Sequence, residues 1–492
     1  MAHAQPAPVI TAAPTDTTGT WGKSGVLSVT AMDANAYQWY RGESGDTTTP
    51  VVGATSPLLV TQALSGSSRF WVRVTNATLS TDSPSASVAI TPPQQHRALA
   101  AMGRNSSGQL GDGSTTRRLS PVQITTEFAS IAAGGSHSLF IKTDGSLWAM
   151  GDNNAGKLGD GSTTSRSTPV QIATDVVSTA AGGSHSLFIK TDGSLWAMGI
   201  NSSGQLGDGS STSHSSPVQV ATGVASVSAG IAHTLFIKTD GSLWAVGSNS
   251  AGQLGDETAV NTARTIPVQV ATGVISASAG SLHSLFIKAD NSLWGMGSNT
   301  QGQLAFSAGN SPAQITTGVA SISTGDFHSL FIRTDGTLWA MGENFYGQLG
   351  DGSFTTRYTP VQIATNVRSI SAGNRHSLFI KTDGALFVMG NNGSGQLGNG
   401  TFNSSSYPLQ ITTEVSSTSA GGSHSLFVGL FHTVIFDLGT HATRSGGGEL
   451  LQKIMHGTSA TPPTLNLARL DLYWLGHRLL LRHCRLGGHR PI

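Results

Sequence analysis

Residues 134–151 read GGSHSLFIKTDGSLWAMG, and residues 182–199 repeat the same letters without a change. The intervals between successive histidines of this repeat are 48, 48, 50, 45, 48 and 48 residues. A fixed period in this range predicts stacked repeats or a propeller rather than one irregular core. The repeated histidines are His137, His185, His233, His283, His328, His376 and His424.

Each repeat has the pattern of four short β-strands. The Asp144-Gly145 pair separates two apolar runs and is typical of a hairpin turn, because glycine adopts positive φ without steric strain. No run is long enough for an amphipathic helix, and four strands per unit of this length are typical of propeller blades. In the first full repeat we predict strands at Ser130–Ala133, His137–Lys142, Ser146–Met150 and Pro169–Ile172.

The two ends of the repeat region complement each other. A Gly-x-Asn element begins at Gly103 with no histidine hairpin before it, and His424 has no tryptophan strand after it. Pairing of residues 98–124 with residues 415–428 would complete one sheet and remove an exposed edge. We therefore predict an all-β chain whose residues 97–430 form a seven-bladed β-propeller, closed by pairing of its N- and C-terminal strands.

The unit G-x-x-H-S-L-x-x-x-x-D-G-x-L-W-x-x-G-x-N-x-x-G-Q-L-G-D-G resembles the repeat of the regulator of chromosome condensation family. This family includes a guanine-nucleotide exchange factor, a plant ultraviolet-B photoreceptor, a bacterial β-lactamase inhibitor type and secreted bacterial proteins, and the chain looks like the last type. The resemblance implies the fold but no single function, because propellers carry many unrelated activities. In the first repeat it is carried by Gly134, His137, Asp144, Gly145, Trp148, Gly151, Asn153, Gly156, Leu158 and Gly159.

The segment before the repeats has a different pattern. Residues 8–92 resemble an immunoglobulin-like β-sandwich, in which Trp39 lies where that fold buries its strand C tryptophan. Val72 takes the usual second cysteine position and Phe70 the tyrosine-corner position, so apolar packing must replace both the disulfide and the tyrosine hydrogen bond. We predict a residual segment at 1–7 and a linker at 93–96, within the stretch Pro92-Pro93-Gln94-Gln95.

The segment after the repeats, residues 431–492, abandons the pattern. It holds six of the 16 histidines and seven Lys and Arg against three Asp and Glu. Leu470–Leu481 is apolar but too short to span a bilayer. One interpretation is a basic helical tail that contacts a membrane or a partner. We favour an abnormal C-terminus, such as one translated out of frame, because a regular repeat ends abruptly.

Composition excludes several classes of protein. The net charge is +1 and 11% of the residues are charged, which argues against nucleic acid as the partner. No run of 18 apolar residues predicts a transmembrane segment, and Cys484 is the single cysteine, so no intrachain disulfide forms. Ala2-His3-Ala4 has the small-x-small form of a signal-peptide cleavage site. We therefore expect an extracellular or cell-surface protein whose signal peptide is removed or missing.

The repeated histidines and aromatic residues are expected to be structural. Histidines at one point of every blade would be spread around a ring, whereas zinc needs four ligands within about 2.3 Å of one point. We expect each histidine to bond to backbone beside a glycine turn, and we expect no metal. The tryptophans are expected to form the core between blades, and the segments that match the photoreceptor motif contain none. They are Trp148, Trp196, Trp244, Trp294 and Trp339, with Phe387 in the sixth place.

The sequence shows no catalytic motif. It contains no Gly-x-Ser-x-Gly elbow and no phosphate-binding Gly-Lys-Ser/Thr. Gly-Asp-Gly-Ser and Asp152-Asn153-Asn154 faintly suggest a calcium loop, but the terminal Glu of an EF-hand is absent. Near-identical blades are also a poor way to build one asymmetric centre. We therefore predict no enzyme activity, no catalytic residue and no cofactor.

The repeats differ mainly in their loops. In a meander, the loop before each histidine and the loop after each Gly-x-Asn emerge on the same face. Early repeats carry Gly, Ser and Thr there, whereas later repeats carry aromatic and charged side chains, which are typical of binding hot spots. We predict that the partner-binding residues are Asp326, Phe327, Phe345, Tyr346, Phe354, Arg357, Tyr358, Asn374 and Arg375.

These observations favour a non-enzymatic scaffold that binds a protein partner through the loop face around His328 and His376. The alternative is a carbohydrate-binding surface protein, because aromatic rings also stack on sugars. A more distant alternative is exchange-factor activity. The exchange factor inserts a wedge into its GTPase, and here the largest interval exceeds the usual 48 residues by only two.

Overall fold

The computed structural model describes residues 6–20, 26–61, 67–91, 96–257, 260–305, 309–435, 444–447, 451–455 and 463–465. The predicted linker at 93–96 and the apolar segment Leu470–Leu481 lie mostly or wholly outside these residues. The chain divides into two compact units, the larger of which contains His96–Phe431.

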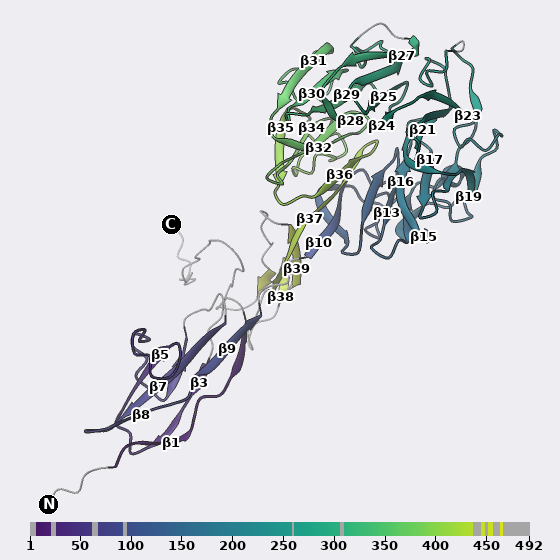
Figure 1. Cartoon of the computed structure of the whole chain (residues 1–492). Coiled ribbons are helices and arrows are strands. Elements are labelled where there is room, and N and C mark those ends of the chain that lie inside the picture. Colours follow the sequence, from purple (N-terminus) through teal and green to yellow (C-terminus); the bar gives the residue numbers. More distant parts are fainter. Residues whose placement is uncertain are drawn as a thin grey trace, which may run out of the picture. The chain divides into compact units, whose positions relative to one another are not determined.

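The larger unit is built from repeated four-stranded antiparallel sheets, as expected of a β-propeller. The described residues form six of them, of which β12-β13-β14-β15 is the first full repeat, and a seventh sheet, β11-β10-β37-β36, to which β39 adds a fifth strand. In Figure 1 the outer strands β15, β19, β23, β27, β31 and β35 lie at the periphery of this unit, and β24, β28 and β32 lie nearer its middle.

The strands occupy four equivalent positions in these sheets. The innermost strands are β12 (Ser130–Ala133), β16 (Val176–Ala181), β20 (Val224–Ala229), β24 (Val274–Ala279), β28 (Val319–Thr324), β32 (Val367–Ala372) and β36 (Ser417–Ala420). The second strands are β13 (His137–Ile141), β17 (His185–Lys190), β21 (His233–Lys238), β25 (His283–Lys288), β29 (His328–Arg333), β33 (His376–Lys381) and β37 (His424–Ile435). The third strands are β10 (His96–Gly103), β14 (Leu147–Gly151), β18 (Leu195–Gly199), β22 (Leu243–Gly247), β26 (Leu293–Gly297), β30 (Leu338–Gly342) and β34 (Leu386–Gly390). The outermost strands are β11 (Arg118–Thr125), β15 (Arg166–Ala173), β19 (His214–Ala221), β23 (Arg264–Ala271), β27 (Gly309–Thr316), β31 (Arg357–Ala364) and β35 (Ser405–Thr412).

The sheet β11-β10-β37-β36 combines strands from both ends of the repeat region. Strand β10 pairs with β37 over eight positions, from His96 opposite Phe431 to Gly103 opposite His424. The fourth strand of each sheet begins earlier than the sequence pattern predicts. In the first repeat it starts at Arg166 rather than Pro169, because Arg166 already lies opposite Gly151 of β14. Proline is tolerated on this strand because an outermost strand has one unpaired edge.

The Asp-Gly turns explain one part of the repeat motif. Gly145 has a φ of 80°, and Asp144 Oδ1 accepts hydrogen bonds from the backbone N–H and the hydroxyl of Ser146. The Ser146 hydroxyl in turn accepts a hydrogen bond of 2.8 Å from Trp148 Nε1. Each residue of Asp-Gly-Ser-x-Trp therefore has its own role in one hairpin.

The core lies between neighbouring sheets. Phe188 of one sheet packs with Leu139, Leu147 and Leu158 of the preceding sheet. A buried phenylalanine of this kind contributes about 1.5–3 kcal/mol relative to an exposed one. The same packing joins the two ends of the repeat region, since Met102 of β10 lies in one cluster with Leu378 of β33. The repeated tryptophans are half-buried at the rim of these clusters.

The smaller unit contains a mixed sheet of order β2-β9-β7-β5, with β8 beside β7. Trp39 on β5 and Val72 on β7 lie opposite each other, and both are fully buried in one apolar cluster with Phe70. The pairs β1-β4 and β3-β6 form two further antiparallel ladders. The strands are β1 (Val9–Ala12), β2 (Thr17–Thr20), β3 (Val26–Ser28), β4 (Thr30–Met32), β5 (Ala36–Arg41), β6 (Leu58–Val60), β7 (Ser68–Thr75), β8 (Ser80–Asp82) and β9 (Ala86–Thr91).

The described parts of the C-terminal segment are strands. Strand β38 (Arg444–Gly447) pairs with β40 (Pro463–Leu465), and β39 (Leu451–Met455) pairs with β37. The described chain contains a single 3-10 turn, η1 (Asn154–Gly156). Within the described residues, no helix is long and apolar enough to cross a membrane.

Candidate functional site

A ring of hydrogen bonds between neighbouring sheets fixes the scaffold that carries the loops. Nε2 of each repeated histidine lies 2.8–3.0 Å from the Ser or Thr hydroxyl that follows the histidine of the next sheet. The bond from His424 to Ser138 links the last sheet to the first full repeat. The partner is thus a side-chain hydroxyl rather than the backbone group that the sequence analysis expected.

The hydroxyl groups determine which ring nitrogen carries the proton. The Ser186 hydroxyl donates its single hydrogen to the Lys157 carbonyl oxygen at 2.7 Å, so it accepts from His137. His137 is therefore neutral with its proton on Nε2, and its Nδ1 is buried without a partner. Burial lowers the pKa of every histidine of the ring, for example to about 3 at His233 and about 4 at His185.

The glycines before the histidines are required by close contacts. A Cβ atom on Gly134 would lie 2.4 Å from His137 Cε1 and 2.7 Å from the Gly182 carbonyl oxygen. Such distances leave no room for a side chain, so each histidine and its glycine form one unit at the end of an inner strand.

The long loop after each Gly-x-Asn is held by its asparagine. Asn344 is fully buried, and its Nδ2 donates to Asp351 Oδ1 at 2.9 Å and to the Ser353 carbonyl oxygen at 3.0 Å. Its Oδ1 accepts from the Leu349 N–H at 3.0 Å. The Gly-Asp-Gly-Ser aspartate is therefore a partner of asparagine, and the loop chemistry needs no calcium ion.

Arg357 makes an ion pair that recurs in the repeats. Its Nε donates to Asp351 Oδ2 at 2.6 Å, and the same ion pair occurs between Arg166 and Asp160. Arg118, His214 and Arg264 have the equivalent aspartate partners in other sheets. This recurrence favours a role of Arg357 in the loop structure, and its role in partner binding stays a prediction.

Three predicted aromatic residues lie exposed on this face. Phe345 is 61% exposed, Phe354 55% and Tyr358 60%. Phe345 and Phe354 are in the loop between β30 and β31, and Tyr358 is the second residue of β31. Tyr358 also lies beside Gly302 of the preceding sheet. Phe327 is half-buried, and its carbonyl oxygen accepts a hydrogen bond of 2.8 Å from the Glu343 N–H.

Arg375 and Tyr346 form a pair across two neighbouring sheets. The guanidinium carbon of Arg375 lies 5.1 Å from the centre of the Tyr346 ring, and Nη1 donates to the Tyr346 hydroxyl at 3.1 Å. Such a cation–π contact is worth about 0.5–1 kcal/mol at an exposed site. The pair holds an arginine near the centre of the loop face.

Asp326 and Asn374 line a cavity of about 110 Å³ that is bordered by a loop from each of the seven sheets. The Asp326 N–H donates to the Asn374 carbonyl oxygen at 3.4 Å, which joins the two loops. Burial raises the pKa of Asp326 to about 6, Arg375 opposes this rise and Glu343 adds to it. The structure thus brings Asp326, Asn374 and Arg375 together, as part of one continuous region.

Two aromatic residues of the same face were not predicted from the sequence. Phe402, in the loop between β34 and β35, is 49% exposed. Tyr407 of β35 is 64% exposed and packs over Gly352 of the preceding sheet. Arg117 lies 5.5 Å from the ring centre of Phe402. Phe402 follows Gly-Asn-Gly-Thr as Phe354 follows Gly-Asp-Gly-Ser, so alignment of the repeats was the signal that could have found it.

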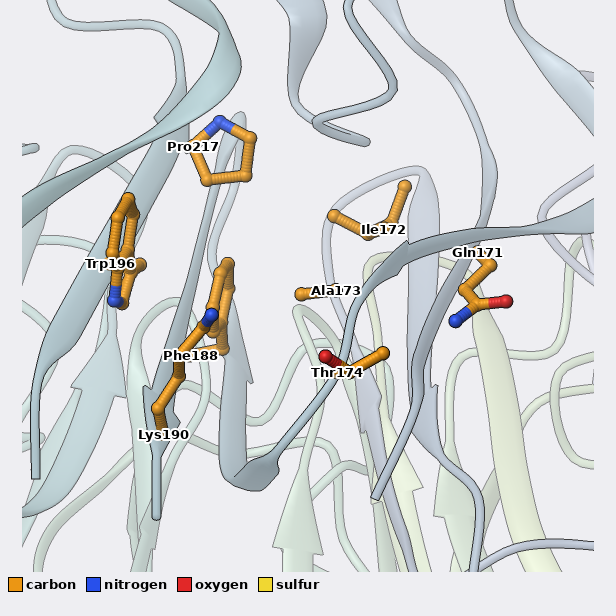
Figure 2. A pocket seen from close by; sticks show the side chains of 8 residues that line it. All are labelled: Gln171, Ile172, Ala173, Thr174, Phe188, Lys190, Trp196 and Pro217. Atoms are coloured by element: carbon orange, nitrogen blue, oxygen red, sulfur yellow. The ribbon is translucent and has the colours of Figure 1, made fainter. Parts of the chain in front are cut away.

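A second concave region lies between two sheets. A groove of about 590 Å³ is lined by residues of β15 and the sheet β16-β17-β18-β19. Figure 2 shows Trp196, Phe188 and Lys190 on one side, and Ile172, Ala173 and Thr174 on the other. Lys190 Nζ lies 5.3 Å from the Trp196 ring centre, and equivalent Lys or Arg contacts recur at the other repeats. The groove is therefore the rim of the repeated core, and its cation is already engaged.

Metal ligands are not gathered in the part of the chain that the structure describes. No group of three or more His, Cys, Asp or Glu side chains is placed there to hold an ion. The loop face thus combines exposed aromatic rings, one stacked arginine and a carboxylate at a cavity.

The family comparison agrees with the geometry. Residues 98–427 match the RCC1-like domain, so the chain belongs to the family of proteins that contain this domain. Among curated proteins, no sequence matches the chain.

Solved structures show the same fold. Human WBSCR16 is 22% identical with a TM-score of 0.61, over 68% of this chain and 98% of that protein. Prp20p from Saccharomyces cerevisiae, studied with its binding to Gsp1p and histones, is 22% identical with a TM-score of 0.61, over 69% of this chain and 92% of that protein. Yeast RCC1 (Prp20) in a structure with Kap60 is 21% identical with a TM-score of 0.62, over 68% of this chain and 89% of that protein. At this identity the likeness concerns the fold alone.

Proposed function

We propose that the chain is a non-enzymatic scaffold that binds a protein partner through the loop face of the sheets β28–β31 and β32–β35. One observation carries this proposal. Among the described residues, all the aromatic side chains that are exposed lie on this face, and they are Phe345, Phe354, Tyr358, Phe402 and Tyr407. Rigidly held aromatic residues bury large areas at little entropic cost, which makes them typical anchors of protein interfaces.

The relatives support a protein partner. Prp20p was studied with its binding to Gsp1p and histones, and yeast RCC1 was observed bound to Kap60. In our proposal the seven sheets are the blades of one closed propeller, the N-terminal unit is an immunoglobulin-like sandwich, and the protein acts outside the cell. The loops that bind are then presented by a scaffold whose position the histidine ring fixes.

The test is a comparison of two variants of the full chain. The first variant carries Phe345→Ser, Phe354→Thr and Tyr358→Ser. These replacements resemble the residues at the equivalent positions of other repeats. The matched control changes Val177→Ser and Ile275→Ser, which are 57% and 56% exposed at the other ends of inner strands. A protein captured from extracts of the source organism, identified by mass spectrometry and purified, is then titrated against each.

We expect the aromatic variant to lose at least tenfold in affinity, because several anchors are removed, and the control to bind like the wild type. Equal binding by all three proteins would contradict the proposal, as would failure of the wild type to retain any protein. Release of the captured material by free sugar would instead support the carbohydrate alternative.

A further inference from the structure

The cavity on the loop face contains one ionisable residue. Its described lining consists of small residues, Ile231, Thr324, Asn374 and Asp326, and Asp326 alone carries a charge. A volume of about 110 Å³ equals roughly three to four water molecules, which suits a side-chain head group with part of its stem. The Asp326 carboxylate makes no hydrogen bond or ion pair within the described residues.

A second carboxylate, that of Glu343, lies near Asp326, since its charge adds to the rise of the Asp326 pKa. Glu343 is 7% exposed, and its Oε2 accepts one long hydrogen bond of 3.4 Å from Gln348 Nε2. Burial raises the pKa of Glu343, and Arg375 opposes the rise. Two carboxylates therefore share a poorly solvated region, where an additional positive charge is favourable.

The neighbouring cation is already engaged. Arg375 stacks on Tyr346 and donates to its hydroxyl, and it makes no ion pair with Asp326 or Glu343 in the described structure. Two carboxylates face one guanidinium, which leaves this region with a deficit of one positive charge when both acids are ionised.

The scaffold does not require Asp326. Its position is Gly135, Gly183 or Ile231 in earlier sheets. The position of Glu343 is Ile200 in one sheet, and elsewhere it holds Asp152, Ser248 or Asn391, each of which contacts the residue five positions later, as Glu343 contacts Gln348. Those sheets have the same hydrogen-bonding registers and burial patterns. Asp326 is therefore an addition to the common fold, whereas Glu343 also makes a contact that recurs in other repeats.

We propose that the protein partner places a lysine or arginine side chain in this cavity, against Asp326 and near Glu343, with apolar residues of the partner on the surrounding aromatic rings. This inference rests on the proposed function and names the chemistry of the partner. Lysine and arginine combine a slender apolar stem with a charged head, which matches a narrow cavity lined mainly by Ala and Gly with a carboxylate at its wall. The half-buried Phe327 and the exposed Phe345 flank the region on the same sheet.

The probe is the peptide acetyl-Ala-Phe-Lys-Phe-Ala-amide, titrated by NMR against the full chain and compared with the same peptide containing norleucine or glutamate in place of lysine. We expect the lysine peptide to bind at least tenfold more tightly than either, because only lysine supplies the positive charge. Binding should also lower the pKa of the Asp326 carboxyl, observed by its carbon resonance, because a cation stabilises the ionised form.

Two variants that should change the affinity for the lysine peptide in opposite directions distinguish a role in binding from a structural role. Asp326→Asn with Glu343→Gln should weaken lysine-peptide binding at least tenfold, whereas Arg375→Ala should strengthen it by removing a competing cation. The matched control is Asp335→Asn with Asp383→Asn, two exposed turn aspartates whose replacement gives the same change in charge. Unchanged melting temperatures show that each variant is folded.

Equal binding of the lysine and norleucine peptides would overturn the inference, as would an unaltered lysine affinity in the double variant. These failures are separable from failure of the proposed function. If the double variant retains the purified partner fully while the aromatic variant loses it, the protein-binding face stands and the cationic side chain does not.

Discussion

The sheets β16–β19 and β28–β31 have the same backbone and core but different loops on one face. Their second strands are equally buried, and His185 and His328 make the same bond to the next sheet. The loops of the first contain Gly183, Ser202 and Ser211 where the second has Asp326, Phe345 and Phe354. Since Gly and Ser serve the fold at these positions, the aromatic and acidic residues are free to serve recognition.

The largest expected effect concerns the histidine ring, which both sheets share, and its contribution to the free energy of unfolding. Each ring histidine has a folded pKa well below its unfolded value of about 6.5, so its contribution to stability is lost as the pH falls below that value. Within that range the unfolded state binds protons that the folded state excludes, at about 1.4 kcal/mol per pH unit for each histidine. We expect the free energy of unfolding to fall steeply below pH 6.5, measured by chemical denaturation.

The histidine variants separate this cause from others. In His185→Gln the free energy of unfolding should change less steeply with pH, by the amount that corresponds to about one proton. His328→Gln should have the same effect. A slope that stays the same in both variants would show that other groups cause the acid sensitivity.

The second prediction concerns the asparagine of each loop. Asn201→Ala and Asn344→Ala should each lower the free energy of unfolding by about 1–3 kcal/mol, because both side chains are buried and leave loop partners unsatisfied. The measurement is urea denaturation. A much smaller loss of stability in one of the two variants would show that the loops of the two sheets are held by different contacts, which would contradict the shared scaffold.

The third prediction compares Arg166 with Arg357, which make the same ion pair in two different sheets. Arg166→Ala and Arg357→Ala should each cost no more than about 1 kcal/mol, since both arginines are partly exposed. Neither should change the affinity for the partner, measured by calorimetry. A loss of affinity in Arg357→Ala alone would instead support the predicted role of Arg357 in partner binding.

The smallest expected effect on stability comes from the exposed rings. Phe354→Thr with Tyr358→Ser should change the free energy of unfolding by less than about 0.5 kcal/mol, because both rings lie mainly in solvent. Thermal unfolding checks this, with Leu349→Ala as a control that should be strongly destabilised because Leu349 is fully buried. A large loss in the double variant would assign the rings to packing.

Much of the candidate site could be predicted from the sequence because the residues at equivalent positions of the repeats can be compared. Phe345, Phe354 and Tyr358 stand out against Ser and Thr at equivalent positions, and the structure places them exposed on one face. Phe402 carries the same signal and was missed. Arg357 was predicted without its aspartate partner, six residues earlier, because that ion pair is seen only when the loop is folded.

The sequence by itself determined the period, the Asp-Gly hairpins and the all-β repeat, because these depend on contacts within a few residues. Only the tertiary structure decided where the histidines bond, since their partners lie 46 to 51 residues away or, for His424, at the other end of the repeats. The same holds for Asp326, an ordinary loop aspartate in the sequence. The structure gives it a cavity, a buried neighbour and an arginine held on another sheet, because loops distant in the chain meet where the sheets converge.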